Sequence, residues 1–208
     1  MKFIATLALL PLICPVATAL VVNSLIPPIE GYTIWEPEWE VEVAPNTTIV
    51  ARGTIEQVRT QLSKINPRWE ADNKAKREAA TADVVELTKR TDFVTDGRVD
   101  CGGRWERTRW ERIHDGIEYL RSVPGQPTNG PGPGACGRVS CSYGGAIWWC
   151  NDNTTPKTLA GYGSIADGAQ AIMDKCRYYE VGGRYWVSGQ AFHKTGWNVI
   201  VRHDNNNC

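Results

Sequence analysis

The sequence predicts a small α+β protein held together by disulfides, in which two helices pack on an antiparallel sheet and a β-β-α segment precedes them. Three observations lead to this prediction. Six of the seven cysteines fall between residues 101 and 208. Helix-like and hairpin-like patterns alternate over the same part of the chain. A cysteine-free stretch before it carries strand and helix patterns of its own.

The first 19 residues have the layout of a secretory signal peptide. Residues 1–2 give a positive start, residues 3–16 are almost wholly apolar, and residues 17–19 form a small-residue cleavage site that ends at Ala19. The apolar run is too short for a membrane span, and no later stretch is longer. We therefore predict a secreted, extracellular protein without a transmembrane segment.

Residues 20–90, the leader segment, contain no cysteine. Apolar and acidic residues alternate over 38–43, which predicts a half-buried strand, and residues 47–51 can form a second strand. Thr54 is placed to cap a helix that ends at Asn66-Pro67. The apolar face of this helix consists of Ile55, Val58, Leu62 and Ile65.

A charged stretch, residues 69–88, follows and predicts a solvated helix or a flexible linker. It ends at Lys89 and Arg90, a pair of the kind that dibasic processing proteases cut. Lys76-Arg77 shows that such pairs also occur without a boundary beside them. We predict cleavage after Arg90, which makes the leader a pro-segment and residues 91–208 the mature domain.

The mature domain opens with a predicted helix over residues 103–123, because apolar residues recur on one face until Pro124-Gly125. Two β-rich runs, 139–143 and 146–150, flank Gly144-Gly145 and predict a hairpin with a tight turn at the two glycines.

A second helix is predicted from Ser164 to Cys176, with Asp167 three residues after the start, as in a capping arrangement. Residues 185–192 and 197–201 are predicted as two further strands, joined by a turn at 194–196.

Cysteine usage agrees with an exported protein. Once Cys14 is removed with the signal peptide, an even number remains, which predicts three disulfides with fifteen possible connectivities. These cysteines are Cys101, Cys136, Cys141, Cys150, Cys176 and Cys208. No CxxC pair occurs and no histidine lies at zinc spacing from them, so we expect neither a metal nor a cofactor.

The mature domain resembles the secreted killer toxins of smut fungi and the related fungal extracellular effectors. The matching features are an early cysteine, Cys141 on a central strand, and a helix that ends in Cys176. A Gly-x-x-Val-x-Val-like last strand over 196–201 then runs into the terminal Asn207-Cys208. The leader, around residues 53–58, is similar to the pro-segments of other fungal secreted proteins.

The resemblance implies a split α/β sandwich. It also implies three bridges, Cys101–Cys176, Cys136–Cys150 and Cys141–Cys208. With Gly144-Gly145 as the turn, Cys150 would oppose Val139, so the second bridge would require a bend of the chain at Gly137.

The toxins' action on calcium channels of target cells is attributed to a basic residue near the central-strand cysteine. The nearest match in this chain is Arg138, which we interpret as a solvated surface residue, and channel block is not inferred from it.

Catalysis is not expected from the sequence, which we interpret as that of a non-enzyme. His193 and His203 flank the last hairpin and could approach each other, whereas His114 lies on a polar helix face. No G-x-S-x-G nucleophile motif is present. Asp152 with Asp167 or Asp174 would make an acid pair, but the sequence fixes no separation between them.

Binding has more support. An aromatic platform could gather for sugar rings or a protein partner, in which one of two adjacent tryptophans on a strand is exposed. Its candidate residues are Tyr143, Trp148, Trp149, Trp186 and Trp197, together with Arg138. Simple packing of each ring is the alternative.

Two functions follow as hypotheses. The first is a secreted fungal effector or toxin-like protein that binds a target on a host or competitor cell, with a role in virulence or cell death. The alternative is a secreted hydrolase or a cell-wall carbohydrate-binding protein. The partner would be an extracellular or cell-surface protein or glycan, and we expect a monomer. Nucleic acid is not expected as a partner, because 23 basic and 23 acidic residues balance.

Sequons at Asn46 and Asn153 permit N-glycosylation.

Overall fold

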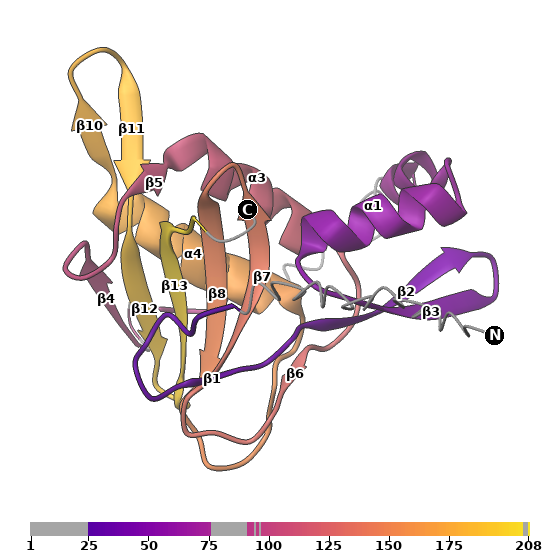
Figure 1. The fold of residues 1–208 in the computed structure, drawn as a ribbon, viewed down its shortest axis with the longest axis horizontal. Coiled ribbons are helices and arrows are strands. Elements are labelled where there is room, and N and C mark those ends of the chain that lie inside the picture. Colours follow the sequence, from indigo (N-terminus) through magenta and orange to yellow (C-terminus); the bar gives the residue numbers. More distant parts are fainter. Residues whose placement is uncertain (1–24, 76–90, 94, 96, 206–207) are drawn as a thin grey trace, which may run out of the picture.

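The computed structural model describes residues 25–75, 91–93, 95, 97–205 and 208. Its main element is a six-stranded sheet in the order β1-β7-β8-β13-β12-β4, antiparallel except for the parallel pair β1–β7 (Figure 1). Helices α3 and α4 cover one face of this sheet (Figure 1). This mixed architecture agrees with the predicted small α+β class. None of the helices in the described ranges is long and apolar enough to cross a membrane.

The bounds of the elements are as follows. The strands are β1 (Thr33–Ile34), β2 (Glu38–Ala44), β3 (Thr47–Arg52), β4 (Gly97–Cys101), β5 (Thr108–Arg109), β6 (Thr128–Asn129), β7 (Ala135–Ser142), β8 (Gly145–Asn151), β9 (Lys157–Thr158), β10 (Tyr178–Glu180), β11 (Arg184–Val187), β12 (Gly189–His193) and β13 (Trp197–His203). The helices are α1 (Ile55–Ile65), α3 (Trp110–Ser122) and α4 (Tyr162–Cys176), and residues 69–75 are also helical.

The β-β-α unit of the leader is present as predicted. Strand β2 alternates buried Trp39, Val41 and Val43 with exposed glutamates, because successive side chains of a strand point to opposite faces. Thr54 and Gln57 form a capping box at the start of α1. Ile65, predicted on the buried face of this helix, is exposed.

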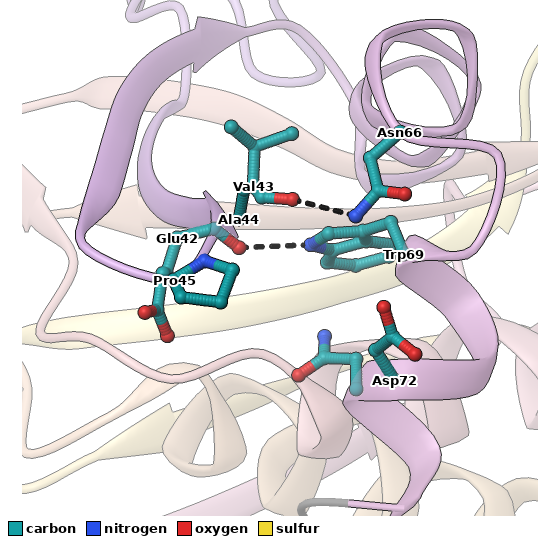
Figure 2. A pocket seen from close by; sticks show the side chains of 8 residues that line it. Glu42, Val43, Ala44, Pro45, Asn66, Trp69 and Asp72 are labelled. Atoms are coloured by element: carbon teal, nitrogen blue, oxygen red, sulfur yellow. Dashed lines mark hydrogen bonds between the residues drawn. The ribbon is translucent and has the colours of Figure 1, made fainter.

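The chain beyond α1 forms a second, mostly exposed helix over residues 69–75, and its first residue packs against the leader hairpin. Trp69 is buried, and its indole N–H donates to the Glu42 carbonyl at 3.0 Å (Figure 2). The Asn66 amide donates to the Val43 carbonyl at 2.9 Å beside it (Figure 2). The helix alternative of the prediction is therefore present over residues 69–75, with residues 71, 72, 74 and 75 exposed, but the burial of Trp69 was not expected. The remainder of the predicted segment lies outside the described residues.

The central hairpin turns one residue earlier than predicted. Strand β7 ends at Ser142, and the two turn residues are Tyr143 and Gly144, both with positive φ as a type I′ turn requires. A β-bulge between Arg138 and Ser140 then shifts the register, so that Cys136 faces Cys150 directly. The expected opposition of Cys150 to Val139 is wrong.

The two helices predicted in residues 91–208 begin at other residues than expected. Helix α3 begins at Trp110, because residues 102–103 adopt positive φ and β5 pairs with β11 just before the helix. Helix α4 begins at Tyr162 after Gly161. Asp167 therefore lies inside the helix, where its carboxylate accepts a hydrogen bond from the Thr91 backbone N–H at 2.8 Å. Its predicted capping role is wrong.

The predicted strand over 185–192 is two strands of different sheets. Ser188 separates β11, which pairs with β10 and β5, from β12, which pairs with β13 and β4. The hairpin β10–β11 was not predicted. The turn at 194–196 between β12 and β13 is confirmed.

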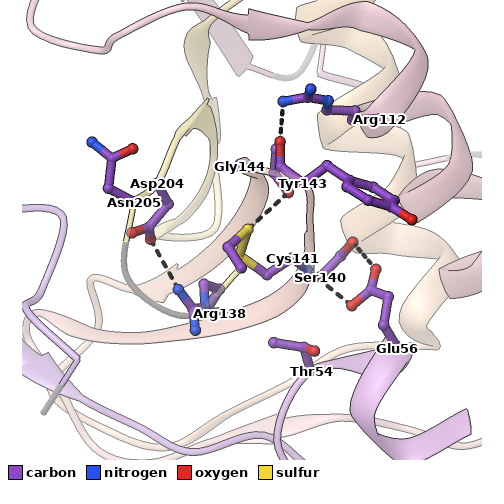
Figure 3. Close-up of a disulfide and its surroundings, with 12 residues drawn as sticks. Thr54, Glu56, Arg112, Arg138, Ser140, Cys141, Tyr143, Gly144, Asp204 and Asn205 are labelled. Carbon is purple, nitrogen blue, oxygen red and sulfur yellow. Dashed lines mark hydrogen bonds and ion pairs between the residues drawn. A yellow bond between two sulfur atoms is a disulfide. The ribbon is translucent and has the colours of Figure 1, made fainter. Parts of the chain in front are cut away.

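Three disulfides staple this architecture, and they are the three pairs that the resemblance implied. Cys101–Cys176 joins the end of β4 to the end of α4, and Cys136–Cys150 crosses from β7 to β8. Cys141–Cys208 attaches the C-terminus to β7 (Figure 3).

The Cys141–Cys208 bridge yields a prediction about stability. It spans 67 residues, and in the chain-entropy model a loop of this length stabilises the fold by about 4 kcal/mol. We expect Cys208→Ala to lower the free energy of unfolding by several kcal/mol and to leave Cys141 as a free thiol. Chemical denaturation and thiol titration measure both. Unchanged stability would contradict the structural role of this bridge.

Candidate functional site

The predicted aromatic platform does not assemble. Tyr143 is exposed in the central turn, but Trp148, Trp149 and Trp197 are all buried. The side chains of β8 alternate between two cores: Trp149 packs on the helix side of the sheet and Trp148 packs on the opposite side. The expectation that one of the two adjacent tryptophans is exposed is wrong, because both faces of the sheet are covered. The uninterrupted apolar run 146–150 is the sequence signal of a strand buried on both faces.

Arg138 is a buried structural residue and not a solvated one. Its side chain is 3% exposed and forms an ion pair with Asp204 at 3.4 Å, close to the Cys141–Cys208 bridge (Figure 3). The guanidinium also lies 5.9 Å from the centre of the Trp148 ring. A target on another cell could not reach this charge while the fold is intact.

The remaining candidate, Trp186, belongs to the best exposed aromatic surface of the described residues. The aromatic hairpin, residues 177–187 comprising β10 and β11, projects away from the main sheet (Figure 1). Nine large hydrophobic side chains are exposed in the described ranges, and four of them lie here. They are Tyr178 (49% exposed), Tyr179 (56%), Val181 (96%) and Tyr185 (36%).

Two arginine guanidinium groups lie over tyrosine rings of this hairpin. The guanidinium of Arg107 lies 4.2 Å from the Tyr178 ring centre, and that of Arg177 lies 5.0 Å from the Tyr185 ring. The Trp186 indole N–H donates to Glu180 at 2.7 Å across the hairpin. The aromatic side chains are therefore held in place before any partner binds.

Sequence reasoning missed most of this surface, although a signal was present. Two aromatic pairs, Tyr178-Tyr179 and Tyr185-Trp186, flank Gly182-Gly183, and both glycines adopt positive φ in the turn. This arrangement is typical of a hairpin. The signal was missed because residues 185–192 read as one continuous strand.

The histidines expected to approach each other are far apart. His193 pairs with Trp197 at the start of β13, and His203 ends that strand, so about 20 Å of strand separates them. His193 contacts the Thr195 hydroxyl and His203 contacts the Asn205 side chain. His114 stacks on Trp110.

The three aspartates considered as acid pairs each have other partners. Asp152 accepts hydrogen bonds from Tyr32 and Asn198, and Asp174 accepts one from Gln170. Burial and the Asp152 carboxylate raise the pKa of the Tyr32 hydroxyl. Asp167 binds the Thr91 N–H and forms an ion pair with Arg121 at 3.3 Å. In the part of the chain that the structure describes, no group of three His, Cys, Asp or Glu side chains is placed to hold a metal ion.

Comparison with known proteins adds no relative. No family model, no curated protein and no solved structure matches the chain.

The two sequons differ in their surroundings. Asn46 is exposed in the turn between β2 and β3. The amide nitrogen of Asn153, to which a glycan would be attached, instead donates hydrogen bonds to Asn151, Thr195 and Gly196, at 2.6 to 3.1 Å.

This difference predicts glycosylation at Asn46 alone in a eukaryotic host, because a glycan on Asn153 would break contacts that anchor the β12–β13 turn. Removal of N-glycans should lower the mass of the chain that carries residues 20–90, whether cut or uncut, by one glycan, and Asn46→Gln should abolish this change. Asn153→Gln is the matched control and should still carry the glycan. A second glycan that disappears in the Asn153→Gln variant would contradict the prediction.

Proposed function

We propose that this chain is a secreted effector or toxin-like protein that binds a target on the surface of another cell through the aromatic hairpin. The single observation that supports the proposal is the concentration of exposed tyrosine and valine side chains on one projecting, preorganised hairpin. Tyrosine, tryptophan and arginine dominate the binding energy of protein interfaces, and all three occur here.

The charge around the hairpin favours an acidic protein surface as the partner. Arg107 and Arg177 lie over tyrosine rings, and Arg184 is a further basic residue of β11, whereas Glu180 is the one acidic residue within the hairpin sequence. Guanidinium groups pair well with carboxylates, and the rings supply apolar area without the loss of much side-chain entropy.

Membership of the killer-toxin-like fungal effectors, with their split α/β sandwich, is part of this proposal. It is supported by the three disulfide pairs, which match those that the resemblance implies. Secretion is supported by the disulfides and by the signal-like residues 1–19, which lie outside the described part of the chain.

Processing after Arg90 is also part of the proposal, and both Lys89 and Arg90 lie outside the described residues. Support comes from the adjoining residue. The Thr91 backbone nitrogen lies 2.8 Å from the Asp167 carboxylate, whose side chain is 12% exposed. Cleavage would turn this nitrogen into an ammonium group, and the contact would become a charge-assisted hydrogen bond.

N-terminal sequencing of the secreted protein tests the processing. We expect a chain that starts at Thr91, and its loss when Lys89 and Arg90 are both replaced by Gln. The matched control is the same double replacement at Lys76-Arg77, which should leave the Thr91 start unchanged. A secreted protein that starts only at Leu20 would contradict cleavage after Arg90.

The hairpin is tested by placing a charge at its tip. Val181→Asp should weaken binding of the labelled protein to host or competitor cells at least tenfold, because a desolvated carboxylate would oppose the partner's acidic surface. Val50→Asp is the matched control, since Val50 is equally apolar and 64% exposed but lies on the leader. Equal binding by both variants would place the target site elsewhere.

The hydrolase alternative is tested with the histidines. His193→Ala and His203→Ala should retain the biological activity, because neither residue has a proton-transfer role in the proposal. A loss of several orders of magnitude in a folded variant would favour the hydrolase.

A further inference from the structure

We infer that residues 25–75 of the leader are a lasting subunit of the folded protein, which stays bound by noncovalent contacts after the chain is cut between residues 76 and 90. The inference goes beyond the proposed function and does not depend on whether the producing cell makes the cut. It rests on four sets of contacts between the leader and residues 91–208.

The first set lies along the edge of β7 that faces away from β8. The backbone N–H of Thr33 donates to the Gly134 carbonyl at 2.6 Å, and that of Trp35 donates to the Cys136 carbonyl at 2.8 Å. Strand β1 thus extends the main sheet. Glycine occupies the two positions under the leader's rings: a Cβ on Gly137 would lie 2.2 Å from the Trp35 ring, and one on Gly134 would lie 2.7 Å from the Tyr32 ring.

The second set covers the face of the sheet that the helices leave open. Leu25, Ile29 and Tyr32 pack against the cluster that contains the buried Trp148 and Ile200. In Figure 1 the leader chain runs in front of this face before it reaches β1. The Tyr32 hydroxyl also donates to Asp152 at 2.9 Å. Without the leader, this apolar face would meet water.

The third set lies on the helix side of the sheet. The Trp35 ring meets Trp149 edge-on at 5.3 Å, and Trp39 stacks on Tyr162 of α4 at 4.2 Å. The Tyr162 hydroxyl donates to the Glu38 carbonyl at 2.7 Å. Burial, and to a lesser degree the nearby Glu38 charge, raise the pKa of this hydroxyl, so it remains a donor at every physiological pH. One continuous core includes the leader's Leu62 and the mature domain's side chains.

The fourth set is polar. Helix α1 directs Glu56 at the far end of β7, where its two carboxylate oxygens accept hydrogen bonds from the Ser140 hydroxyl at 2.5 Å and the Cys141 backbone N–H at 2.9 Å (Figure 3). Arg59 of the same helix lies 3.6 Å from the Tyr119 ring of α3. The leader therefore satisfies edge groups at both ends of β7.

These contacts make each part dependent on the other. An uncovered β7 would present unpaired backbone groups beside a large apolar face, which is a site for aggregation. Residues 25–75 contain no cysteine and are too few to bury a sufficient core alone. All six cysteines of the disulfides lie in residues 101–208, so any retention of the leader after cleavage is noncovalent.

The full chain, cut in vitro by a dibasic-specific protease, provides the first test. Both dibasic pairs, Lys76-Arg77 and Lys89-Arg90, lie between the two described parts. We expect the two pieces to co-elute at one-to-one stoichiometry in size-exclusion chromatography without denaturant. Elution of a folded 91–208 piece alone, or precipitation of one piece while the other stays soluble, would overturn the inference.

Exchange of the leader between cut complexes provides the second test. Unlabelled and isotope-labelled cut complexes are mixed, and native mass spectrometry follows the exchange rate. Glu56→Gln should speed exchange about fivefold, because a charge-assisted hydrogen bond becomes a neutral one. Trp35→Ala should speed leader exchange about 30-fold or more, because the variant lacks the large ring that packs over Gly137.

Glu40→Gln is the matched control for Glu56→Gln, since Glu40 belongs to the leader but is exposed on β2. It should leave the exchange rate unchanged within twofold. Near-ultraviolet circular dichroism and disulfide mapping of each uncut variant verify folding. If all three properly folded variants exchange at the rate of the original protein, the described contacts do not hold the leader and the inference is wrong.

Discussion

The structure depends on a central hairpin that is buried on both faces. Every residue of β8 is buried, and every residue of β7 except Ser142 is buried as well. A strand of this kind needs an apolar layer on each side, since its side chains alternate between the two faces. Helices α3 and α4 form one layer. The other layer includes leader residues, namely Leu25, Ile29 and Tyr32.

This double coverage decides which aromatic and charged side chains are exposed. It removes Trp148, Trp149 and Trp197 from the surface, and it buries Arg138 against Asp204. Apart from Tyr143 in the β7–β8 turn, the exposed aromatic side chains of the described residues lie outside the main sheet. The aromatic hairpin belongs to a separate three-stranded sheet with β5, so its rings are not required to fill the central core. The buried core and the exposed aromatic hairpin thus belong to different sheets.

The disulfides and the leader restrain different parts of the main sheet, the first covalently and the second through noncovalent contacts. Cys101–Cys176 secures the β4 edge to α4, and Cys136–Cys150 and Cys141–Cys208 secure β7 from within the mature domain. No disulfide reaches the leader, which holds β7 through Glu56, strand β1 and the ring of Trp35. Covalent and noncovalent restraints therefore meet on the same strand.

The sequence by itself determined the features that depend on neighbouring residues. Alternation over 38–43 and the Thr54–Gln57 box specify the leader's strand and helix, and glycine and polar residues mark the turn at 194–196. The register of the central hairpin, the split of 185–192 at Ser188 and the burial of Arg138 were decided by tertiary structure. A β-bulge, a change of sheet partner and a second covering layer each depend on residues distant in the chain. For example, Gly137 is explained by the ring of Trp35, about a hundred positions earlier, and local pattern carries no information about such a contact.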